Sequence, residues 1–302
     1  MRQRIRGYTD GVIELAGSDL SRIAADLADI QRVVLSSEDL RLVLADPGVP
    51  ASARRSVLTD LFGGRVDDRT LQLVGFIVEA DRAPEFPANL AWLAPRVDAA
   101  ARGSRPVATT VLGLHGAEER LDGYATALLA PLEGDNDLTR VDDELFRFMR
   151  IVDGSPELNT VLTDRELLPE ARRSLVEDLL RDKADPTTVG LAAYATEVGR
   201  PRDYLELLGY LVDRVAAESD RRVAEVRAAV DLDEQQRQLL AEALARVVGH
   251  GVEVRVTVDP SVLAGFVATI GDTVVDGSAR HRLEILKERL LSPEATNTGD
   301  RS

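Results

Sequence analysis

A segment in the first third of the chain recurs in its middle, and this internal repeat constrains the fold more than any other feature of the sequence. Ala53–Ser56 reads Ala-Arg-Arg-Ser and returns as Ala171–Ser174, 118 residues further on. The same offset carries Asp46 onto Asp164 without a gap. Self-similarity at a fixed spacing is the signature of a structural unit that is built twice. We therefore expect two homologous domains in tandem.

Apolar residues recur at helical spacing within both copies of the repeat. They stand at positions i, i+3, i+4 and i+7, which places them on one face of an α-helix. The clearest stripes are Leu73, Phe76, Ile77 and Ala80 in the first copy and Leu191, Tyr194, Ala195 and Val198 in the second. Ser37 and Ser155 stand where serine caps the start of a helix. Each copy is therefore predicted to be a bundle of about six helices, over residues 1–110 and 111–220.

The final part of the chain changes from helical periodicity to the alternation of a β-strand. Residues 252–258 read Val-Glu-Val-Arg-Val-Thr-Val, apolar and polar in turn, which is the pattern of a half-buried strand. Residues 223–230, 266–270 and 273–275 are further strand candidates, and residues 233–248 form an amphipathic helix pattern. Gly271-Asp272 lies between two of these strands and suits a tight hairpin turn.

These elements predict a small α+β domain of order β-α-β-β-α over residues 221–291. Ser278 is placed to cap its final helix. Residues 292–302 are polar and are expected to be a disordered tail. The fold class is thus mostly α, with two homologous six-helix bundles followed by the α+β domain.

The charge and composition exclude several kinds of function. The chain has 52 acidic and 37 basic residues, and its net charge of −15 repels a nucleic-acid backbone. It has no cysteine, which excludes disulfides, thiolate zinc sites and cysteine nucleophiles. No run of about 18 apolar residues is present, and no apolar run follows the basic start as in a signal peptide. We expect a chain that neither spans a membrane nor is exported by such a signal.

No group of residues suggests catalysis, a cofactor or a metal ion. His115, His250 and His281 lie far apart in the sequence, which is not the spacing of a metal site. Gly271–Ser278 lacks the lysine of a phosphate loop and the terminal glutamate of a calcium loop. No serine or threonine stands in a nucleophile elbow. We expect no catalytic, cofactor-binding or metal-binding residue.

Two arginine pairs could suggest anion binding. Arg54-Arg55 and Arg172-Arg173 both have acidic residues nearby on their predicted helices. Helical surfaces of mixed charge are usually solvated, and we expect both pairs to lie on such faces.

Residues 254–284 resemble the C-terminal signature of the ATP synthase delta subunits, called the oligomycin-sensitivity-conferring protein in mitochondria. A strand that ends in an acid, an apolar turn with a glycine, Ile-Gly-Asp and Asp-Gly-Ser follow one another in the order of that signature. The positions that carry it are Gly265, Ile270, Gly271, Asp272, Asp276, Gly277 and Ser278. Because Tyr124–Leu128 and Ser155–Leu158 are similar to upstream parts of the family, residues 117–291 resemble one full-length delta subunit.

Residues 1–110 go beyond the ordinary family, which has one helical domain. They resemble the duplicated domain in the fused b-delta subunits of mycobacteria and related actinobacteria. Those fusions carry a membrane-spanning b-type segment upstream of the duplicated domain. The sequence shows no such segment, and we expect it to have been removed or to be encoded elsewhere.

The resemblance implies a non-catalytic stator subunit of the F-type ATP synthase. The helical domain would grip N-terminal helices of alpha subunits on the catalytic hexamer, and the C-terminal domain would hold the b-type peripheral stalk. The chain would then resist rotor torque during proton-driven ATP synthesis. It would lie at the cytoplasmic face of the bacterial plasma membrane, as a peripheral protein that meets the membrane only through the complex, with no cofactor and no nucleic-acid partner.

A partner helix needs an apolar cleft between helices, and the second copy offers one candidate. The expected contacts of an alpha-subunit helix are Tyr124, Leu128, Leu191, Tyr194, Ala195 and Val198. The same side chains could instead fill the core of their own bundle, and the sequence leaves both readings open. The acids of the C-terminal signature either orient contacts with the stalk or serve only the turn and the helix cap.

A function of another class is a helical-repeat scaffold or regulatory protein unrelated to ATP synthase, which the duplication alone would allow. The change to a strand period argues against it, because a solenoid continues its helical repeat. An enzyme would need polar groups that converge in a pocket, and the sequence offers no such cluster.

Overall fold

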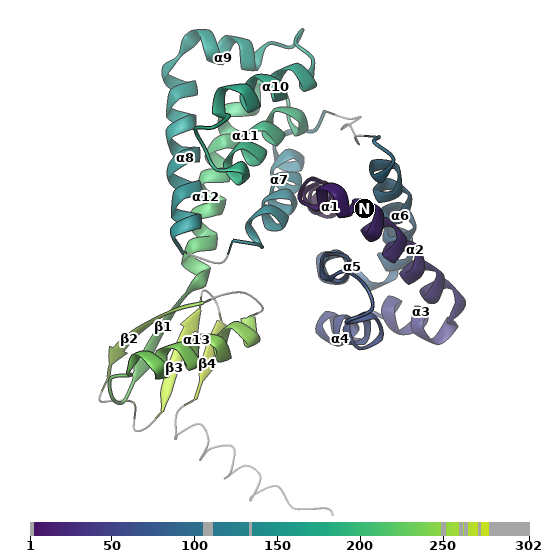
Figure 1. Ribbon diagram of the computed structural model, residues 1–302, viewed down its shortest axis with the longest axis vertical. Coiled ribbons are helices and arrows are strands. Elements are labelled where there is room, and N and C mark those ends of the chain that lie inside the picture. Colours follow the sequence, from purple (N-terminus) through teal and green to yellow (C-terminus); the bar gives the residue numbers. More distant parts are fainter. Residues whose placement is uncertain are drawn as a thin grey trace, which may run out of the picture. The chain divides into compact units, whose positions relative to one another are not determined.

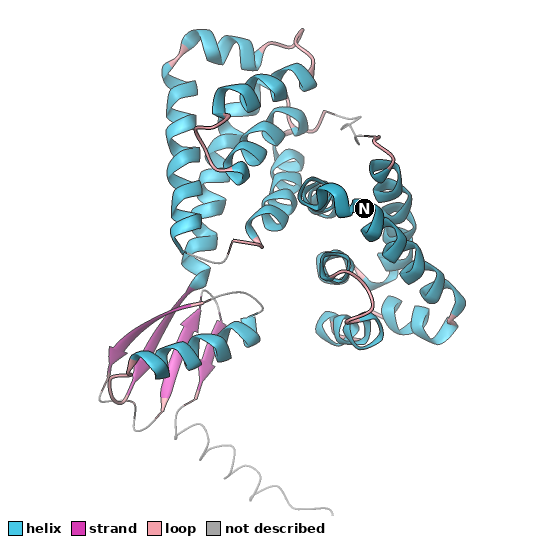
Figure 2. Ribbon diagram, viewed as in Figure 1, coloured by secondary structure: helices cyan, strands magenta, loops and turns pink. Residues whose placement is uncertain are grey.

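The computed structural model describes residues 3–104, 111–132, 135–248, 252–259, 262, 265–270 and 273–277. These residues fall into two compact units (Figure 1). The helical unit comprises the described residues up to 216, except residue 135, and the mixed unit comprises residue 135 and those from 217 on. In Figure 2 strands appear only in the mixed unit. The expectation of a mostly helical chain that ends in a small sheet is confirmed.

Two series of helices follow one another in the described part of the chain. The first series comprises α1 Gln3–Ala16, α2 Leu20–Ser36, α3 Glu38–Ala45, α4 Ala51–Phe62, α5 Asp68–Ala80 and α6 Phe86–Ala101. The second comprises α7 Leu114–Leu129, α8 Asp135–Gly154, α9 Pro156–Thr163, α10 Pro169–Leu180, α11 Pro186–Val198 and α12 Tyr204–Arg222. Short 3-10 turns, η1 Gly17–Asp19, η2 Ala83–Glu85 and η3 Pro201–Asp203, lead into α2, α6 and α12.

The middle helices of the two series correspond in length and spacing. α3, α4 and α5 recur as α9, α10 and α11, each 118 residues further on. The predicted serine caps are present, since the hydroxyls of Ser37 and Ser155 accept hydrogen bonds at 3.3 Å from the N–H groups of Leu40 and Leu158. Such a bond satisfies one of the backbone donors that a helix start leaves free.

A carboxylate on the second helix of each series fastens the start of the fifth. Asp26 accepts a hydrogen bond from the backbone N–H of Asp67, and Glu144 accepts one from that of Asp185, both at 2.7 Å. Each carboxylate also accepts a bond from a threonine hydroxyl on the same fifth helix. Hydrogen bonds to ionised acceptors are stronger than neutral ones. The same contact between the second and the fifth helix is therefore present in both series, with an aspartate in the first and a glutamate in the second.

The first arginine of each predicted solvated pair is buried, which corrects the expectation for these residues. The guanidinium of Arg172 donates to the carbonyl oxygens of Leu167 at 2.6 Å and Asp164 at 3.1 Å. Arg54 likewise donates to two carbonyls that precede its own helix. Loop carbonyls lack helical donors, and the several N–H groups of arginine satisfy them. The prediction that these arginines are solvated was wrong because it considered only nearby acidic side chains and not the backbone carbonyls that a guanidinium can bind.

The mixed unit is a four-stranded sheet with one described helix. Its elements are β1 Val223–Ala228, α13 Glu234–Val248, β2 Glu253–Val258, β3 Phe266–Ile270 and β4 Thr273–Asp276. The strand order is β2-β1-β3-β4. β1 and β2 run parallel and are joined through α13, as parallel strands require a crossover. β3 is antiparallel to both β1 and β4.

The core of the mixed unit lies where the sheet meets α13. Its buried members are Ala224, Val226, Leu240, Leu244, Ala268 and Ile270. The predicted order counts one strand too few, since β3 and β4 are separate strands that pair with each other. The predicted Gly271-Asp272 turn, the helix after Ser278 and the tail over residues 292–302 lie outside the described residues.

We expect Arg172→Met to lower the free energy of unfolding of the helical unit by about 2–3 kcal/mol, because it removes the donor to the partly buried carbonyls of Asp164 and Leu167 and to the buried carbonyl of Thr196. Chemical denaturation followed by circular dichroism measures this. Arg55→Met is the matched control, since the half-exposed Arg55 pairs with Glu79 on the surface and its loss costs at most about 1 kcal/mol. Equal losses in the two variants would contradict the role given to Arg172.

Candidate functional site

The first helices of the two series, α1 and α7, cross at two glycines. A Cβ on Gly7 would lie 1.8 Å from the carbonyl oxygen of Arg120, and a Cβ on Gly123 would lie 1.8 Å from that of Arg4. Only glycine permits backbones to approach so closely. The contact is reciprocal, because each glycine stands before a tyrosine at the corresponding place of its copy. Figure 1 shows α1 and α7 side by side.

An aromatic stack joins the first and fifth helix of each series. Tyr124 of α7 stacks on Tyr194 of α11, with ring centroids 3.8 Å apart. Tyr8 of α1 stacks on Phe76 of α5 at 4.0 Å. Stacked rings add stabilisation beyond the apolar area that they bury. The predicted apolar stripes therefore face the first helix of their own copy.

The structure buries all six residues expected to bind a partner helix, and α1 lies against part of this set. These residues are Tyr124, Leu128, Leu191, Tyr194, Ala195 and Val198, and none is more than 5% exposed. A Cβ on Gly11 of α1 would lie 3.1 Å from the Leu128 side chain and 3.1 Å from the backbone oxygen of Tyr124. We call this set the α7–α11 face. In this structure, the helix that lies on it belongs to the same chain.

A buried carboxylate of α1 fixes the contact with the second copy. Asp10 accepts hydrogen bonds from Arg120 at 2.7 Å, from Arg96 at 2.7 Å and from the Tyr194 hydroxyl at 2.5 Å. Burial raises the pKa of Tyr194 well above its ordinary value, and the Asp10 carboxylate raises it further. Burial alone would lower the pKa of Arg120, but Tyr194 and Asp10 raise it above its ordinary value. The cluster thus holds a neutral tyrosine, a carboxylate and two guanidinium groups, each of which is hydrogen-bonded.

A second ion pair links α1 to α10. Arg173 donates to both oxygens of Glu14 at 2.9 Å and also pairs with Glu177 and Glu197. Its side chain is 6% exposed, which corrects the expectation of a solvated residue. The corresponding Arg55 pairs with Glu79 and remains 48% exposed, as expected. The two arginines differ in exposure because Glu14 of α1 contacts Arg173 and not Arg55.

The described residues of the C-terminal signature serve the sheet. Gly265 has a φ of +84°, a conformation that favours glycine, and Ile270 is buried in the sheet core. Asp276 pairs with Val267 in the β3–β4 register. The N–H of Gly277 donates to the carbonyl of Phe266 at 2.9 Å. Gly271, Asp272 and Ser278 lie outside the described residues, and a role of the signature in stalk binding stays a prediction.

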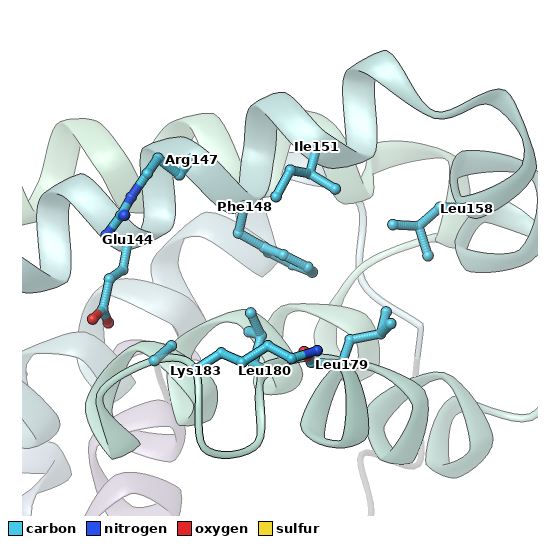
Figure 3. Close-up of a pocket in the computed structure, with 9 residues that line it drawn as sticks. Glu144, Arg147, Phe148, Ile151, Leu158, Leu179, Leu180 and Lys183 are labelled. Atoms are coloured by element: carbon cyan, nitrogen blue, oxygen red, sulfur yellow. The ribbon is translucent and has the colours of Figure 1, made fainter.

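An open apolar cleft of about 310 Å³ lies between α8 and α10 of the second copy, and sequence reasoning missed it. Figure 3 shows Phe148 of α8 pointing toward Leu180 of α10. Its lining residues are Glu144, Arg147, Phe148, Ile151, Leu158, Leu179, Leu180, Lys183 and Ala184. Ile151 at this cleft is 59% exposed. The sequence did contain a signal for the cleft, because Ile151 is a large apolar residue of α8 that lies outside the stripe of apolar residues buried on that helix.

Neither a metal site nor a membrane span is found among the residues that the structure describes. No group of three or more histidine or acidic side chains there is placed to hold a metal ion. None of the helices in the described ranges has the length and apolar character needed to cross a bilayer.

Comparison with a known family gives two consecutive matches. The model of the family described as ATP synthase delta (OSCP) subunit matches residues 5–120 and residues 122–290. The first match covers the first helix series and the start of α7, and the second covers the rest of the second series and the mixed unit.

Relatives of similar length carry the name ATP synthase subunit delta. The one from Nocardia farcinica is 37% identical over 287 residues, which cover 93% of this chain and 91% of the relative. The one from Corynebacterium jeikeium is 34% identical and covers 87% of this chain and 86% of its own. A chain of the Toxoplasma gondii mitochondrial ATP synthase hexamer covers 59% of this chain and 98% of its own at 18% identity, but its TM-score of 0.28 supports no comparison of folds.

We expect Gly123→Ala to destabilise the helical unit by about 2–3 kcal/mol, because the new Cβ forces α1 and α7 apart. Thermal and chemical unfolding measure the effect. Gly116→Ala in the same helix is the matched control, since its Cβ would meet only Leu112 at 3.6 Å, an ordinary contact. Replacing a helical glycine by alanine without strain stabilises by about 0.5–1 kcal/mol. Changes of the same sign in both variants would refute the close crossing.

We expect Asp10→Ala to cost about 3–5 kcal/mol, because it leaves the buried guanidinium of Arg120 without its carboxylate. The control is Asp29→Ala, which removes an exposed pair with Arg32 and changes stability by about 0.5 kcal/mol or less. Amide hydrogen exchange locates the change, since protection should fall in α1 and α7 first. Unchanged protection of α1 would show that Asp10 does not hold it in place.

Proposed function

The chain belongs to the ATP synthase delta (OSCP) subunit family, and on that premise we propose that it is the stator connector of an F-type ATP synthase. In this role it links the catalytic alpha/beta hexamer to the peripheral b-type stalk and resists the torque of the rotor. The observation that carries the proposal is the family match, which extends over residues 5–120 and 122–290. Three relatives that are 37%, 34% and 33% identical to the chain support it.

The division of labour follows the two units. We assign the contact with alpha subunits to the helical unit and the contact with the b-type stalk to the mixed unit. A connector works by stiffness and not by chemistry, and the buried pair of Asp10 with Arg120 and the partly buried pair of Glu14 with Arg173 are features that stiffen a helical assembly. We therefore propose a structural subunit without catalytic groups or cofactors. The ATP chemistry belongs to the hexamer.

The first helix series is proposed to be an extra copy of the delta-type helical domain. The equal spacing of α3–α5 and α9–α11 supports this. The recurrence of the joint built by Asp26 and Glu144 supports it independently. Since α1 lies against Tyr124, Leu128 and Tyr194, an alpha-subunit helix can bind these three residues only by displacing α1.

The proposed place of the chain is peripheral, at the cytoplasmic face of the bacterial plasma membrane. It reaches the membrane through the complex, in accord with the absence of a membrane-spanning helix among the described residues. Its partners are then alpha subunits and the b-type stalk. Nucleic acid is not among them, given the net charge of −15.

Membranes from cells depleted of this chain test the proposal. We expect them to lose proton-driven ATP synthesis, because the hexamer is no longer held against rotation, while the released hexamer still hydrolyses ATP. Addition of the purified chain should restore synthesis. Normal synthesis in depleted membranes would rule out a stator role.

Co-purification separates this function from the alternative of an unrelated helical scaffold. We expect alpha, beta and b-type subunits to be recovered with the affinity-tagged chain at constant ratio. Recovery of other proteins without any of these subunits would favour the scaffold.

A further inference from the structure

We propose that the cleft between α8 and α10 docks an amphipathic helix that carries an acidic side chain, and that an alpha subunit of the hexamer supplies this helix. The identity of the partner rests on the proposed function. The site itself rests on the side chains of the cleft, which Figure 3 shows.

The cleft is lined mostly by apolar side chains, of which Phe148 and Leu180 are buried and Ile151 is exposed. Phe148, Leu179 and Leu180 line it, and Ile151 beside them is 59% exposed. Two helices, α8 and α10, form its long sides. A groove between two helices with large apolar side chains receives the apolar face of a third helix. Its volume of about 310 Å³ is at the low end for a small-molecule pocket, and its open form suits side chains projected from a neighbouring helix.

Two cations at the cleft lack acidic partners. Neighbouring arginines on α8 are ion-paired, since Arg140 pairs with Asp137 and Asp185, and Arg150 pairs with Asp153. By contrast, Arg147 and Lys183 form no ion pair within the described residues, and each donates only to a backbone carbonyl four residues earlier.

Glu144 does not neutralise these cations. It also lines the cleft, but one of its oxygens accepts bonds from the N–H of Asp185 and from the hydroxyl of Thr188, at the start of α11. In a chain of net charge −15, unpaired cations beside an apolar groove favour an occupant with a carboxylate.

The first copy lacks the same combination, which makes the proposed site specific to the second. It carries Asp29, Phe62 and Val66 where the second copy carries Arg147, Leu180 and Ala184. Phe62 and Val66 are larger than their counterparts Leu180 and Ala184, and Asp29 reverses one of the charges. Asp29 is also already paired with Arg32. We therefore expect each molecule of this protein to bind one partner helix, at the cleft of the second copy.

The cleft is available without any rearrangement of the chain. Part of the α7–α11 face lies against α1, which is held by the ion pairs of Asp10 and Glu14. A helix that took this face would have to break both, and unpairing a buried charge is costly. Docking between α8 and α10 leaves these contacts intact.

A labelled synthetic peptide that covers the N-terminal helix of the alpha subunit from the same organism tests the proposal. Fluorescence anisotropy with the full chain gives its Kd. Leu180→Phe with Ala184→Val fills the cleft with the side chains that the first copy has, and we expect it to raise the Kd by at least about tenfold. Lys183→Glu should raise the Kd by roughly fivefold and weaken its salt dependence.

Matched changes in the first copy serve as controls. Arg65→Glu corresponds to Lys183→Glu, and Val33→Asp corresponds to Ile151→Asp at the cleft. We expect both first-copy variants to bind the peptide with a Kd within about twofold of the unchanged chain, and Ile151→Asp to weaken binding by about tenfold. Circular dichroism confirms that every variant is folded.

Three results would overturn the proposal. Equal Kd values for cleft variants and controls would place the peptide elsewhere and leave the stator function standing. Faster amide exchange in α1 on peptide binding would show that the peptide displaces α1 and uses the α7–α11 face. Lack of binding to the unchanged chain would remove the peptide as occupant, and co-purification would then decide the stator function separately.

Discussion

The crossing of α1 and α7 at Gly7 and Gly123 is the contact on which the rest of the helical unit depends. Because no side chain stands between the two backbones there, Asp10 comes within hydrogen-bonding distance of Arg120 and the Tyr194 hydroxyl. These charges are buried, and a buried charge is tolerated only where it is paired and hydrogen-bonded. The glycines therefore set how close α1 lies, and the ion pairs set which way it faces.

Equivalent positions of the sequence repeat differ in exposure and in charge between its first and second copies. Arg55 and Arg173 stand at the same place of the repeat, yet the first is 48% and the second 6% exposed. The difference arises from α1, which brings Glu14 to the second copy. In the same way Asp29 and Arg147 occupy equivalent positions but differ in charge, and only the second borders the α8–α10 cleft. The two helix series thus share the spacing of their middle helices but differ in their exterior contacts.

These features suit a connector that transmits force. A subunit held between a hexamer and a stalk must not yield at its internal joints, and the α1–α7 joint combines close backbone packing with the buried ion pair of Asp10 and Arg120. The apolar cleft between α8 and α10 is the opposite kind of feature, since its cations Arg147 and Lys183 form no ion pair within the described part of the chain. A rigid interior and an adhesive exterior are the two properties that the proposed stator role requires.

The sequence by itself determined the helices, the caps of Ser37 and Ser155, the change to strands and the family, because these depend on residues within a few turns of one another. It also identified the apolar α7–α11 face correctly as a set of neighbouring side chains. Only the tertiary structure decided that α1 lies against part of this face, that Arg173 is buried and that Phe148 lines an open cleft. Periodicity marks a face as apolar, but which element lies against it depends on the contact between Gly7 of α1 and Gly123 of α7, which are more than a hundred residues apart in the sequence.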